Sequence, residues 1–423
     1  MNPETLAIRL QTERSQYQEH SVPLYLTSSY TFHDSEDMRA QFSEEIEGDV
    51  YSRYSNPNVS EFITKIAMLE GAEAGWATAS GMAAIFTTFG ALLSSGDHVL
   101  SCKSVFGSTH RLFNEILPKW GIHHTYVPID DFDSWEDHIQ ENTKILYLET
   151  PSNPGVDIVD LELAGALAKK HNLIFVVDNC FATPIIQQPL KFGAQLSIHS
   201  ATKYIDGQGR TLGGVIVGNQ DLIDEIQGFA RHTGPCISPF NAWVLSKSIE
   251  TLPLRVEKHS SNALEIAKRL EAHPNVENVK YPFLESHPGY EIAKKQMRFG
   301  GGIVTFNIKG GLEAGKEFLD GLKLLSLTAN LGDTRSIATH PASTTHSKLS
   351  PEERASVGIG EGMVRISVGL EHVDDIWCDI NAALTKTVCE VGKEEFGIIS
   401  LSVDELAIAR FGMGNSECVI RNV

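Results

Sequence analysis

From about residue 61 onward, apolar positions alternate between helical spacing and short continuous runs. Helical spacing covers Glu61–Gly71, a stretch from about Ser80 to Leu93, and the regions near 108–119, 159–170 and 220–231. The short apolar runs predict strands at His98–Ser101, His123–Val127, Lys144–Leu148, Leu173–Val177, Gln195–Ile198 and Gly214–Val217. Strands without a polar face that alternate with helices are typical of a mostly parallel sheet covered on both sides. The pattern therefore predicts an α/β fold with a doubly wound, mostly parallel sheet.

The pattern differs on either side of this stretch. Residues 1–60 are polar and mixed, with turn residues at Ser55-Asn56-Pro57-Asn58, and predict an arm. Helical spacing at about 239–250 and 254–272, followed by strands at Gly302–Ile308 and Met363–Val368, predicts a smaller α+β domain. We therefore divide the chain into an N-terminal arm (1–60), a large domain (61–248), a C-terminal α+β domain (249–385) and an extension of unknown role (386–423).

Composition and charge limit the kind of partner. The 423 residues are 42% hydrophobic and 21% charged, which suffices for more than one substructure with its own core. Because 54 acidic residues outnumber 35 basic ones, the net charge of −19 argues against nucleic acid or an anionic membrane surface as the main partner. A small anionic ligand is still compatible with a local positive cluster.

Targeting signals and cysteine spacing predict a location. No basic segment followed by an apolar run opens the sequence, and no apolar stretch approaches the roughly 20 residues that span a bilayer. The six cysteines are scattered without a C-x-x-C pair, which predicts reduced thiols, and neither a disulfide framework nor a zinc site. We expect a cytoplasmic protein without a metal.

Two predicted strands lead into reactive side chains. In open α/β sheets, ligands bind at the carboxyl ends of the strands. Leu173–Val177 runs into Asp178, and Gln195–Ile198 is followed by Ser200-Ala201-Thr202-Lys203-Tyr204. A buried lysine of lowered pKa can attack an aldehyde cofactor, and an aspartate can keep a cofactor's ring nitrogen protonated. Alone, Asp178 is equally a turn residue and Lys203 a solvated surface lysine; together they predict a site.

Anion-binding groups occur before this pair in the sequence. A helix that begins at Ser80-Gly81-Met82 would offer free N–H groups to a phosphate, and Ser200 and Thr202 would add hydroxyl groups. Tyr51 and Arg53 would add a further hydroxyl and a cation, or they belong to an ordinary charged loop.

Arg365 lies inside the apolar strand pattern Met363–Val368, and a buried arginine needs an anionic partner. Its planar fork matches a substrate carboxylate. A structural ion pair with Glu371 or Asp374 is the alternative, and the spacing favours neither.

Six motifs in this order carry a resemblance to a known family: Tyr51-Ser52-Arg53-Tyr54-Ser55-Asn56-Pro57, Ala79-Ser80-Gly81-Met82-Ala83, Glu149-Thr150-Pro151-Ser152-Asn153-Pro154, Val177-Asp178-Asn179, His199-Ser200-Ala201-Thr202-Lys203-Tyr204 and Val364-Arg365-Ile366-Ser367-Val368-Gly369. Together they resemble the Cys/Met-metabolism family of pyridoxal-phosphate (PLP) enzymes, over residues from about 20 to 385. The resemblance implies the fold-type I architecture, PLP as cofactor and a homotetramer built from two tight dimers.

The resemblance also implies roles for individual residues. Lys203 would hold PLP as a Schiff base and move substrate protons, and Asp178 would pair with the ring nitrogen. The remaining cofactor contacts would come from Gly81, Met82, Ser200 and Thr202 at the phosphate, Tyr51 and Arg53 reaching it from a neighbouring subunit, Phe106 on the ring and Asn153 near the ring oxygen. Arg365 would bind the substrate carboxylate, with Asn330 beside it.

Within the family, three features are most like the O-succinylhomoserine sulfhydrylases: Tyr204–Arg210, Val105–Thr109 leading into Leu117–Gly121, and Gly234–Trp243. Phe106 stands where many relatives have a tyrosine, and Asn330 where synthases and lyases commonly have a serine. The resemblance thus implies replacement of the γ-substituent of an O-acylhomoserine, most like O-succinylhomoserine, by sulfide to give homocysteine for methionine biosynthesis. Cystathionine γ-synthase and methionine or cystathionine γ-lyase are the alternatives within the family.

A different class of protein also has to be considered, namely a nucleotide-binding or non-enzymatic α/β protein that uses its glycine-rich runs. Gly207-Gln208-Gly209 follows the lysine motif, and it does not open a helix with the spacing of a dinucleotide fingerprint. The sequence therefore favours the enzyme.

Overall fold

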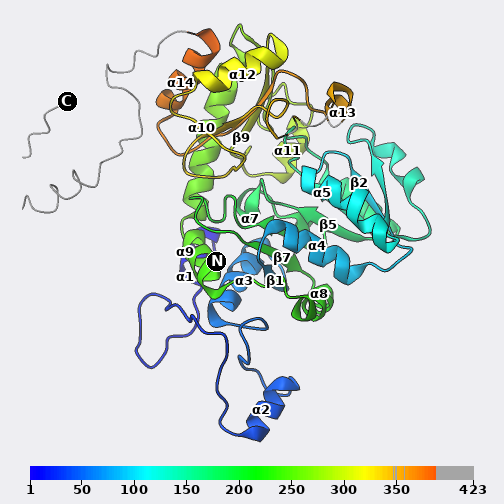
Figure 1. Cartoon of the computed structure of the whole chain (residues 1–423), viewed down its shortest axis with the longest axis vertical. Coiled ribbons are helices and arrows are strands. Elements are labelled where there is room, and N and C mark those ends of the chain that lie inside the picture. The colour runs from blue at the N-terminus through cyan, green and yellow to red at the C-terminus, as the bar shows by residue number, and fades with distance from the viewer. Residues whose placement is uncertain (346, 348–349, 357, 387–423) are drawn as a thin grey trace, which may run out of the picture.

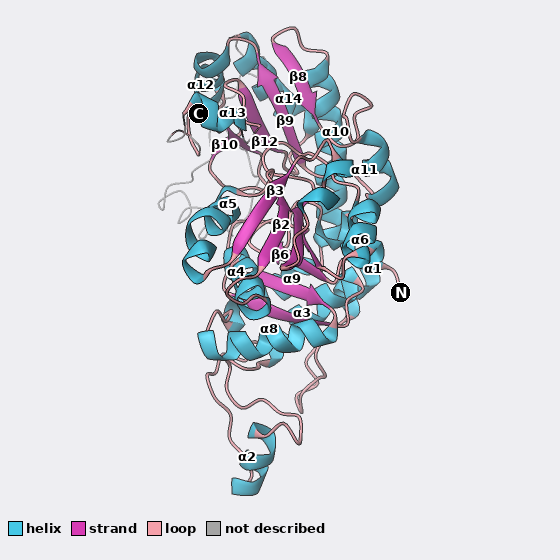
Figure 2. Ribbon diagram, turned by 90° about the vertical axis from the view of Figure 1, so that its right-hand side faces the viewer, coloured by secondary structure: helices cyan, strands magenta, loops and turns pink. Residues whose placement is uncertain are grey.

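A computed structural model of the chain describes residues 1–345, 347, 350–356 and 358–386. Two sheets follow each other along the long axis of the molecule, and the N-terminal arm projects from one end, with helix α2 (Ser35–Phe42) at its tip (Figure 1, Figure 2). Apart from residue 386, the predicted extension (386–423) lies outside the described residues.

The first sheet has seven strands in the order β1-β7-β6-β5-β4-β2-β3. The strands are β1 (Ala74–Thr78), β2 (His98–Cys102), β3 (His123–Val127), β4 (Thr143–Glu149), β5 (Ile174–Asp178), β6 (Leu196–Ser200) and β7 (Gly214–Gly218). The pairs from β6 through β5, β4 and β2 to β3 are parallel, and β7 pairs antiparallel with β6 and β1. The prediction of a mostly parallel α/β sheet is confirmed.

Helices cover both faces of this sheet (Figure 1). On one face α4 (Gly81–Leu92) and α8 (Gln220–Thr233) pack on Tyr147, Ile198 and Ile216. On the other face lie α3 (Pro57–Glu70), α6 (Leu161–Lys170) and α9 (Pro239–Ile249), which bury the alternate strand residues. The doubly wound arrangement follows from strands that are apolar on both faces.

The second sheet has five strands in the order β10-β11-β12-β9-β8, all antiparallel except the pair β10–β11. They are β8 (Val276–Lys280), β9 (Ile303–Ile308), β10 (Ser326–Leu327), β11 (Ile337–Thr339) and β12 (Met363–Ser367). Helices α12 (Gly311–Gly321) and α14 (Val373–Thr385) pack against it. The shorter helices are α1 (Pro3–Arg9), α5 (Gly107–Arg111), α7 (Thr183–Ile186), α11 (Tyr290–Gln296) and α13 (Pro351–Ser356).

Helix α10 (Leu252–Glu271) joins the two sheets. Its first turns bury Leu252 and Val256 in the core beneath the first sheet, and its later turns bury Ile266 and Leu270 in the core of the second. The sheets lie on either side of the predicted boundary at residue 248, and the division of the chain into domains stays a prediction.

The start of α4 shows how the local sequence shapes the site. Ser80 is the N-cap, and its Oγ accepts a hydrogen bond of 3.1 Å from the N–H of Ala83. The first turn of a helix has no internal acceptors for its N–H groups. The N–H groups of Gly81 and Met82 therefore lie at the positive end of α4, next to the end of β6.

The structure corrects two sequence predictions. The helix predicted at 108–119 is divided into α5, a π-helical turn (Leu112–Ile116) and a 3₁₀ turn (Leu117–Trp120). Pro118 explains the break, because it has no N–H for an α-helical hydrogen bond. Cys102, Cys180 and Cys236 are free, but Cys378 is disulfide-bonded, so the expectation of six reduced thiols is wrong. A disulfide depends on distance in the fold, which scattered spacing does not reveal.

None of the helices among the described residues combines the length and apolar character needed to cross a bilayer.

Candidate active site

Lys203 lies in the turn that follows β6. Its Nζ donates a hydrogen bond of 2.6 Å to Oδ1 of Asn330, in the segment between β10 and β11. Burial lowers the pKa of Lys203, and the positive charge of Arg365 lowers it further, against an opposing effect of Cys180. A lysine of lowered pKa holds more of the neutral amine near pH 7, which is the form that attacks an aldehyde.

Asp178 is the last residue of β5 and is only 7% exposed. Its Oδ1 accepts a hydrogen bond of 3.0 Å from the N–H of Cys180, and the hydroxyl of Tyr147 lies 3.5 Å from its Oδ2. Burial raises the pKa of Asp178 to about 6, although the N–H of Cys180 and the charge of His199 act in the opposite direction. A cation placed against this carboxylate, such as a protonated ring nitrogen, would favour its ionised form.

Glu149 is a second buried acid at the strand ends, which the sequence analysis did not select. It ends β4 directly in register with Asp178, and its Oε2 accepts a hydrogen bond of 2.7 Å from the N–H of Phe106. The strand-end rule that pointed to Asp178 applies equally to Glu149. Phe106 itself is 42% exposed and has no hydroxyl group to exchange protons.

The predicted phosphate-binding groups meet where α4 begins. A Cβ on Gly81 would lie 2.5 Å from Cβ of Ser200 and 2.9 Å from its Oγ, so only glycine allows this approach. Met82 is half-buried next to Gly81, and its Sδ lies 3.9 Å from the hydroxyl of Thr109. Thr202 is bonded within the chain, since its Oγ1 accepts from the N–H of Gly213 at 3.1 Å.

Arg365 extends from β12 and is 7% exposed. It donates from one terminal nitrogen to Oδ1 of Asn153 (2.9 Å) and from the other to the backbone carbonyl of Asn330 (3.2 Å), and its Nε is buried without a partner. Burial lowers its pKa to about 10, so the guanidinium stays charged at neutral pH. This arrangement presents a buried cation to a ligand.

The structural ion pair considered for Arg365 is wrong. Glu371 accepts from Ser336 instead, at 2.6 Å from its N–H and 2.9 Å from its hydroxyl. Asp374 pairs with Arg269 at 2.8 Å.

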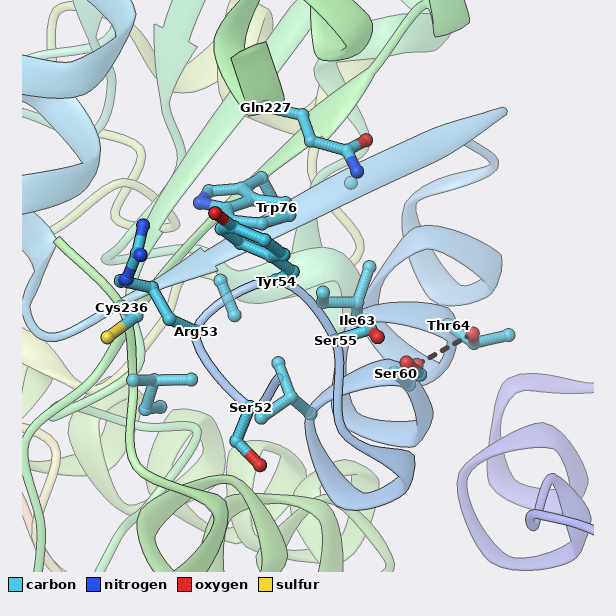
Figure 3. Close-up of a pocket in the computed structure, with 14 residues that line it drawn as sticks. Ser52, Arg53, Tyr54, Ser55, Ser60, Ile63, Thr64, Trp76, Gln227 and Cys236 are labelled. Atoms are coloured by element: carbon cyan, nitrogen blue, oxygen red, sulfur yellow. Dashed lines mark hydrogen bonds between the residues drawn. The ribbon is translucent and has the colours of Figure 1, made fainter. Parts of the chain in front are cut away.

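Tyr51 and Arg53 have their contacts elsewhere. Arg53 lines a pocket between the arm, β1 and α8, where its guanidinium lies 4.8 Å from the ring centroid of Tyr54 and donates to the backbone carbonyl of Arg231 (Figure 3). Tyr51 is 40% exposed and forms an isolated bridge with Ser29. Of the predicted site residues, these two are not joined to the Lys203 cluster by the contacts they make in the single chain.

The donor set of the remaining residues fits PLP. Backbone N–H groups and the Ser200 hydroxyl suit a phosphate, the Asp178 carboxyl suits a ring nitrogen, and the Lys203 amine suits an aldehyde. The unpartnered Nε of Arg365 suits the carboxylate of an amino acid. Among the residues that the structure describes, no group of histidine, cysteine and acidic side chains could hold a metal ion.

Comparison with known proteins agrees with this geometry. The family model described as Cys/Met metabolism PLP-dependent enzyme matches residues 4–385. An O-succinylhomoserine sulfhydrylase of Pseudomonas aeruginosa is 48% identical over 381 residues, which cover 90% of this chain and 94% of that protein. An O-succinylhomoserine sulfhydrylase of Mycobacterium tuberculosis is 45% identical over 386 residues (90% and 95% coverage). An L-methionine gamma-lyase of Fusobacterium nucleatum is 43% identical over 385 residues (90% and 98%).

Solved structures share the fold. A Campylobacter jejuni protein described as an O-acetylhomoserine (thiol)-lyase superposes with a TM-score of 0.87 at 36% identity, covering 91% of this chain and all of that one, and it carries an N′-pyridoxyl-lysine-5′-monophosphate residue. The metB protein of Corynebacterium glutamicum gives a TM-score of 0.86 at 35% identity, covering 91% of this chain and 98% of that one. The fold is fold-type I, and the chain belongs to the Cys/Met-metabolism family of PLP-dependent enzymes.

Proposed function

We propose that this chain is a transferase that replaces the succinyl ester of O-succinylhomoserine with sulfide, giving homocysteine and succinate in methionine biosynthesis. The two sulfhydrylases at 48% and 45% identity support the substrate and the sulfur donor. The observation that carries the proposal is a line of contacts in which Asn330 touches both Lys203, through its side chain, and Arg365, through its carbonyl. Asn330 thus lies between Lys203, which would act as the base, and Arg365, which would bind the substrate carboxylate.

PLP, when bound, withdraws electrons from the α-carbon of an attached amino acid. We assign its phosphate to Gly81, Met82, Ser200 and Thr202, and its ring nitrogen to Asp178. The position of Asp178 supports its role, because a carboxylate that burial makes costly is stabilised by a cation facing it. Thr202 would have to turn its hydroxyl proton away from Gly213 to serve the phosphate.

Lys203 would act as the base once substrate has displaced it from the cofactor. Its Nζ then takes the α-proton of the substrate and returns a proton later in the reaction. Asn330 gives this amine a fixed acceptor at 2.6 Å, so that the amine stays near the reacting carbon. A proton would also have to leave Cβ, after which the bond between Cγ and the ester oxygen would break and succinate would leave with the electron pair. Sulfide would then form the new bond to Cγ, and protons would return to Cβ and Cα.

Arg365 would bind the substrate carboxylate through Nε and one terminal nitrogen. Asn153 then has two neighbours, the guanidinium and the ring oxygen of the cofactor. Because Arg365 has no carboxylate partner in an ion pair among the described residues, its charge is free to select an anionic group.

Phe106 favours a sulfhydrylase over a lyase. A phenyl ring can stack on the cofactor as tyrosine does, but it has no hydroxyl to protonate a leaving group. Succinate is stable as an anion and needs no such proton, whereas the thiol that a γ-lyase expels is more basic. The methionine γ-lyase at 43% identity keeps that activity as the second candidate.

Product analysis tests the proposal. Purified enzyme is given O-succinylhomoserine or O-acetylhomoserine, each with sulfide, with cysteine or with neither. We expect homocysteine and succinate from the first ester with sulfide as the most rapid reaction. Faster release of ammonia and a keto acid without a sulfur donor would identify a lyase, and a preference for cysteine would identify a cystathionine γ-synthase.

We also propose that the chain assembles as a homotetramer in which Tyr51 and Arg53 reach the phosphate in a neighbouring subunit. The arm supports this, because Leu26, Phe42 and Ile46 are exposed there by 70%, 52% and 47%. Apolar side chains grouped on a projecting segment indicate a contact surface. We further propose that the protein is located in the cytoplasm, which cell fractionation can test.

A further inference from the structure

Glu149 and Asp178 form a pair of buried carboxyl groups at the edge of the first sheet. They are the final residues of β4 and β5, stand directly in register, and are 5% and 7% exposed. Neighbouring strands lie about 4.8 Å apart, and residues in register on parallel strands point to the same face. The two carboxyl groups are therefore close neighbours in a site from which water is largely excluded.

Two negative charges in this position would be costly. Burial already disfavours each charged form, and a like charge nearby disfavours it again. His199 partly offsets the cost at Asp178, but the influences on Glu149 include no positive side chain. One of the two groups should therefore keep its proton at neutral pH.

The surroundings indicate which group keeps the proton. Asp178 accepts from the N–H of Cys180 and is also stabilised as an anion by the charge of His199, whereas Glu149 accepts from the backbone N–H groups of Phe106 and Asn153 and has no cation beside it among the described residues. Burial, together with the charge of Asp178, raises the pKa of Glu149 well above its ordinary value. Asp178, with a pKa of about 6, loses its proton first.

We propose that Glu149 is a positioning residue that stays protonated in the folded enzyme. In this form its Oε2 fixes the backbone of Phe106, and Asp178 is left as the single negative charge opposite the ring nitrogen of PLP. The proposal rests on the roles proposed above for Asp178 and Phe106. It adds to the site a second carboxyl group, that of Glu149, which acts in its protonated, uncharged form.

The anchor matters because Phe106 has few other restraints. It lies directly before the five-residue helix α5, and its side chain is 42% exposed in the single chain. The hydrogen bond of 2.7 Å from its N–H to Glu149 ties the start of α5 to the end of β4. Loss of this bond should let the ring move away from the cofactor and weaken cofactor binding.

The first test is Glu149→Gln, which keeps a carbonyl oxygen as acceptor but can carry no charge. The titratable groups around position 149 are Asp178 on β5, Tyr147 on β4 and Cys180 after β5. If Glu149 is neutral in the wild type, the variant keeps the Kd for PLP within about twofold, and the pH midpoint of the cofactor's visible band moves by less than about half a unit. Removal of a real charge would lower that midpoint by about one unit or more, which would overturn the proposal.

The second test is Glu149→Ala, which also removes the acceptor. We expect the Kd for PLP to rise about tenfold and the visible circular dichroism of the bound cofactor to fall, because one hydrogen bond in a buried site is lost. An unchanged Kd and spectrum would refute the anchoring role. Glu141→Gln, an exposed residue just before β4, is the control and should match the wild type.

These measurements use the enzyme with PLP and no substrate. They are therefore independent of which ester or sulfur donor the enzyme accepts, and failure of the proposed function would leave them interpretable. Should Glu149→Ala not fold, the titration of Glu149→Gln alone decides whether position 149 is charged.

Discussion

The carboxyl ends of the first sheet and the N-terminal arm are built in opposite ways. At the strand ends, polar groups are buried and have partners within the chain. Asp178 and Glu149 accept from backbone N–H groups, and Asn330 contacts both Lys203 and Arg365. On the arm, α2 buries none of its residues, and Tyr51 is 40% exposed. Figure 1 shows the arm projecting from the body, whereas the strand ends lie within it.

The two regions differ in what holds their side chains in place. Buried polar groups need partners within the fold, so their arrangement is fixed when the chain folds. An exposed apolar segment has no such constraint and gains stability only by contact with another surface. We infer that the chemistry of the strand ends is arranged within a single chain, while the proposed assembly would add the contacts of the arm to the cofactor.

Replacement of Lys203 should have the largest effect on this arrangement. In Lys203→Ala the lysine bonded to Asn330 is lost, and with it the amine proposed to attach PLP and to take the α-proton. We expect turnover to fall by on the order of 10⁴-fold, the upper end of what a positioned acid or base contributes. Steady-state assay and the visible spectrum measure both consequences.

Lys268→Ala is the matched control for this variant, since Lys268 is exposed on α10. If Lys203→Ala kept the cofactor band and turnover, the carboxyl ends of the first sheet would not be the active site.

The pH dependence of stability should reveal the buried carboxyl at position 178. Its pKa is raised from 3.8 to about 6 in the folded chain without cofactor, so between these values the folded state binds more protons than the unfolded state. Stability contributed by the protonated form is therefore present below pH ~4 and lost as pH rises to ~6. Asp178→Asn does not titrate, so its free energy of unfolding relative to wild type should rise by about 3 kcal/mol over this window.

Urea unfolding of the cofactor-free proteins across this pH range measures the difference. With saturating PLP, the loss of stability in the wild type should become smaller, because a protonated ring nitrogen favours the carboxylate. Asp133→Asn, an exposed residue, serves as control. Parallel pH curves for wild type and Asp178→Asn would mean that the carboxyl is solvated and not held neutral by burial.

Arg365→Ala should affect binding of one substrate more than chemistry. The guanidinium is buried and bonded to Asn153 and Asn330, so its removal takes away the charged groups offered to a carboxylate. Loss of one partner of a buried charged pair costs about 3 kcal/mol, or about 100-fold in the KM for the amino-acid ester. The KM for sulfide is the internal control and should not change; equal increases in both constants would contradict the assigned role.

The sequence predicted the parts of the molecule that are governed by local pattern. The six predicted strands of the first sheet lie at the observed positions, because strands buried on both faces give continuous apolar runs such as Val215–Val217. β1 was missed, since Ala74–Thr78 is short and its pairing with β7 is a long-range contact. In the second sheet, β8 (Val276–Lys280) was missed because its exposed polar residues interrupt the apolar pattern.

The candidate site was predicted less evenly. Lys203 and Asp178 were selected by the strand-end rule. The contact of Lys203 with Asn330 was not predicted, because the two residues are 127 positions apart in the sequence. Glu149 was overlooked although the same rule selects it, because its partner, the N–H of Phe106, is a backbone group without a sequence signal. Partners of buried polar groups are a property of the fold, which explains why neither Glu371 nor Asp374, the two acids considered for an ion pair, is bonded to Arg365.

The smallest predicted effect concerns the arm and is the most direct test of the difference between the two regions. In the single chain Arg53 contacts Tyr54 and Arg231. If it binds the phosphate in a neighbouring subunit, Arg53→Ala should raise the Kd for PLP about tenfold, the loss of one exposed charge-assisted contact. Dilution of the wild type until it dissociates should raise the Kd by at least this factor, whereas the Kd of the variant, which keeps only Tyr51 from the neighbouring subunit, should depend less on dilution. Arg39→Ala, an arm residue paired with Glu36 and Glu45, should behave as wild type. An unchanged Kd in Arg53→Ala, or a Kd in the wild type that does not depend on protein concentration, would show that one chain holds the cofactor without the arm.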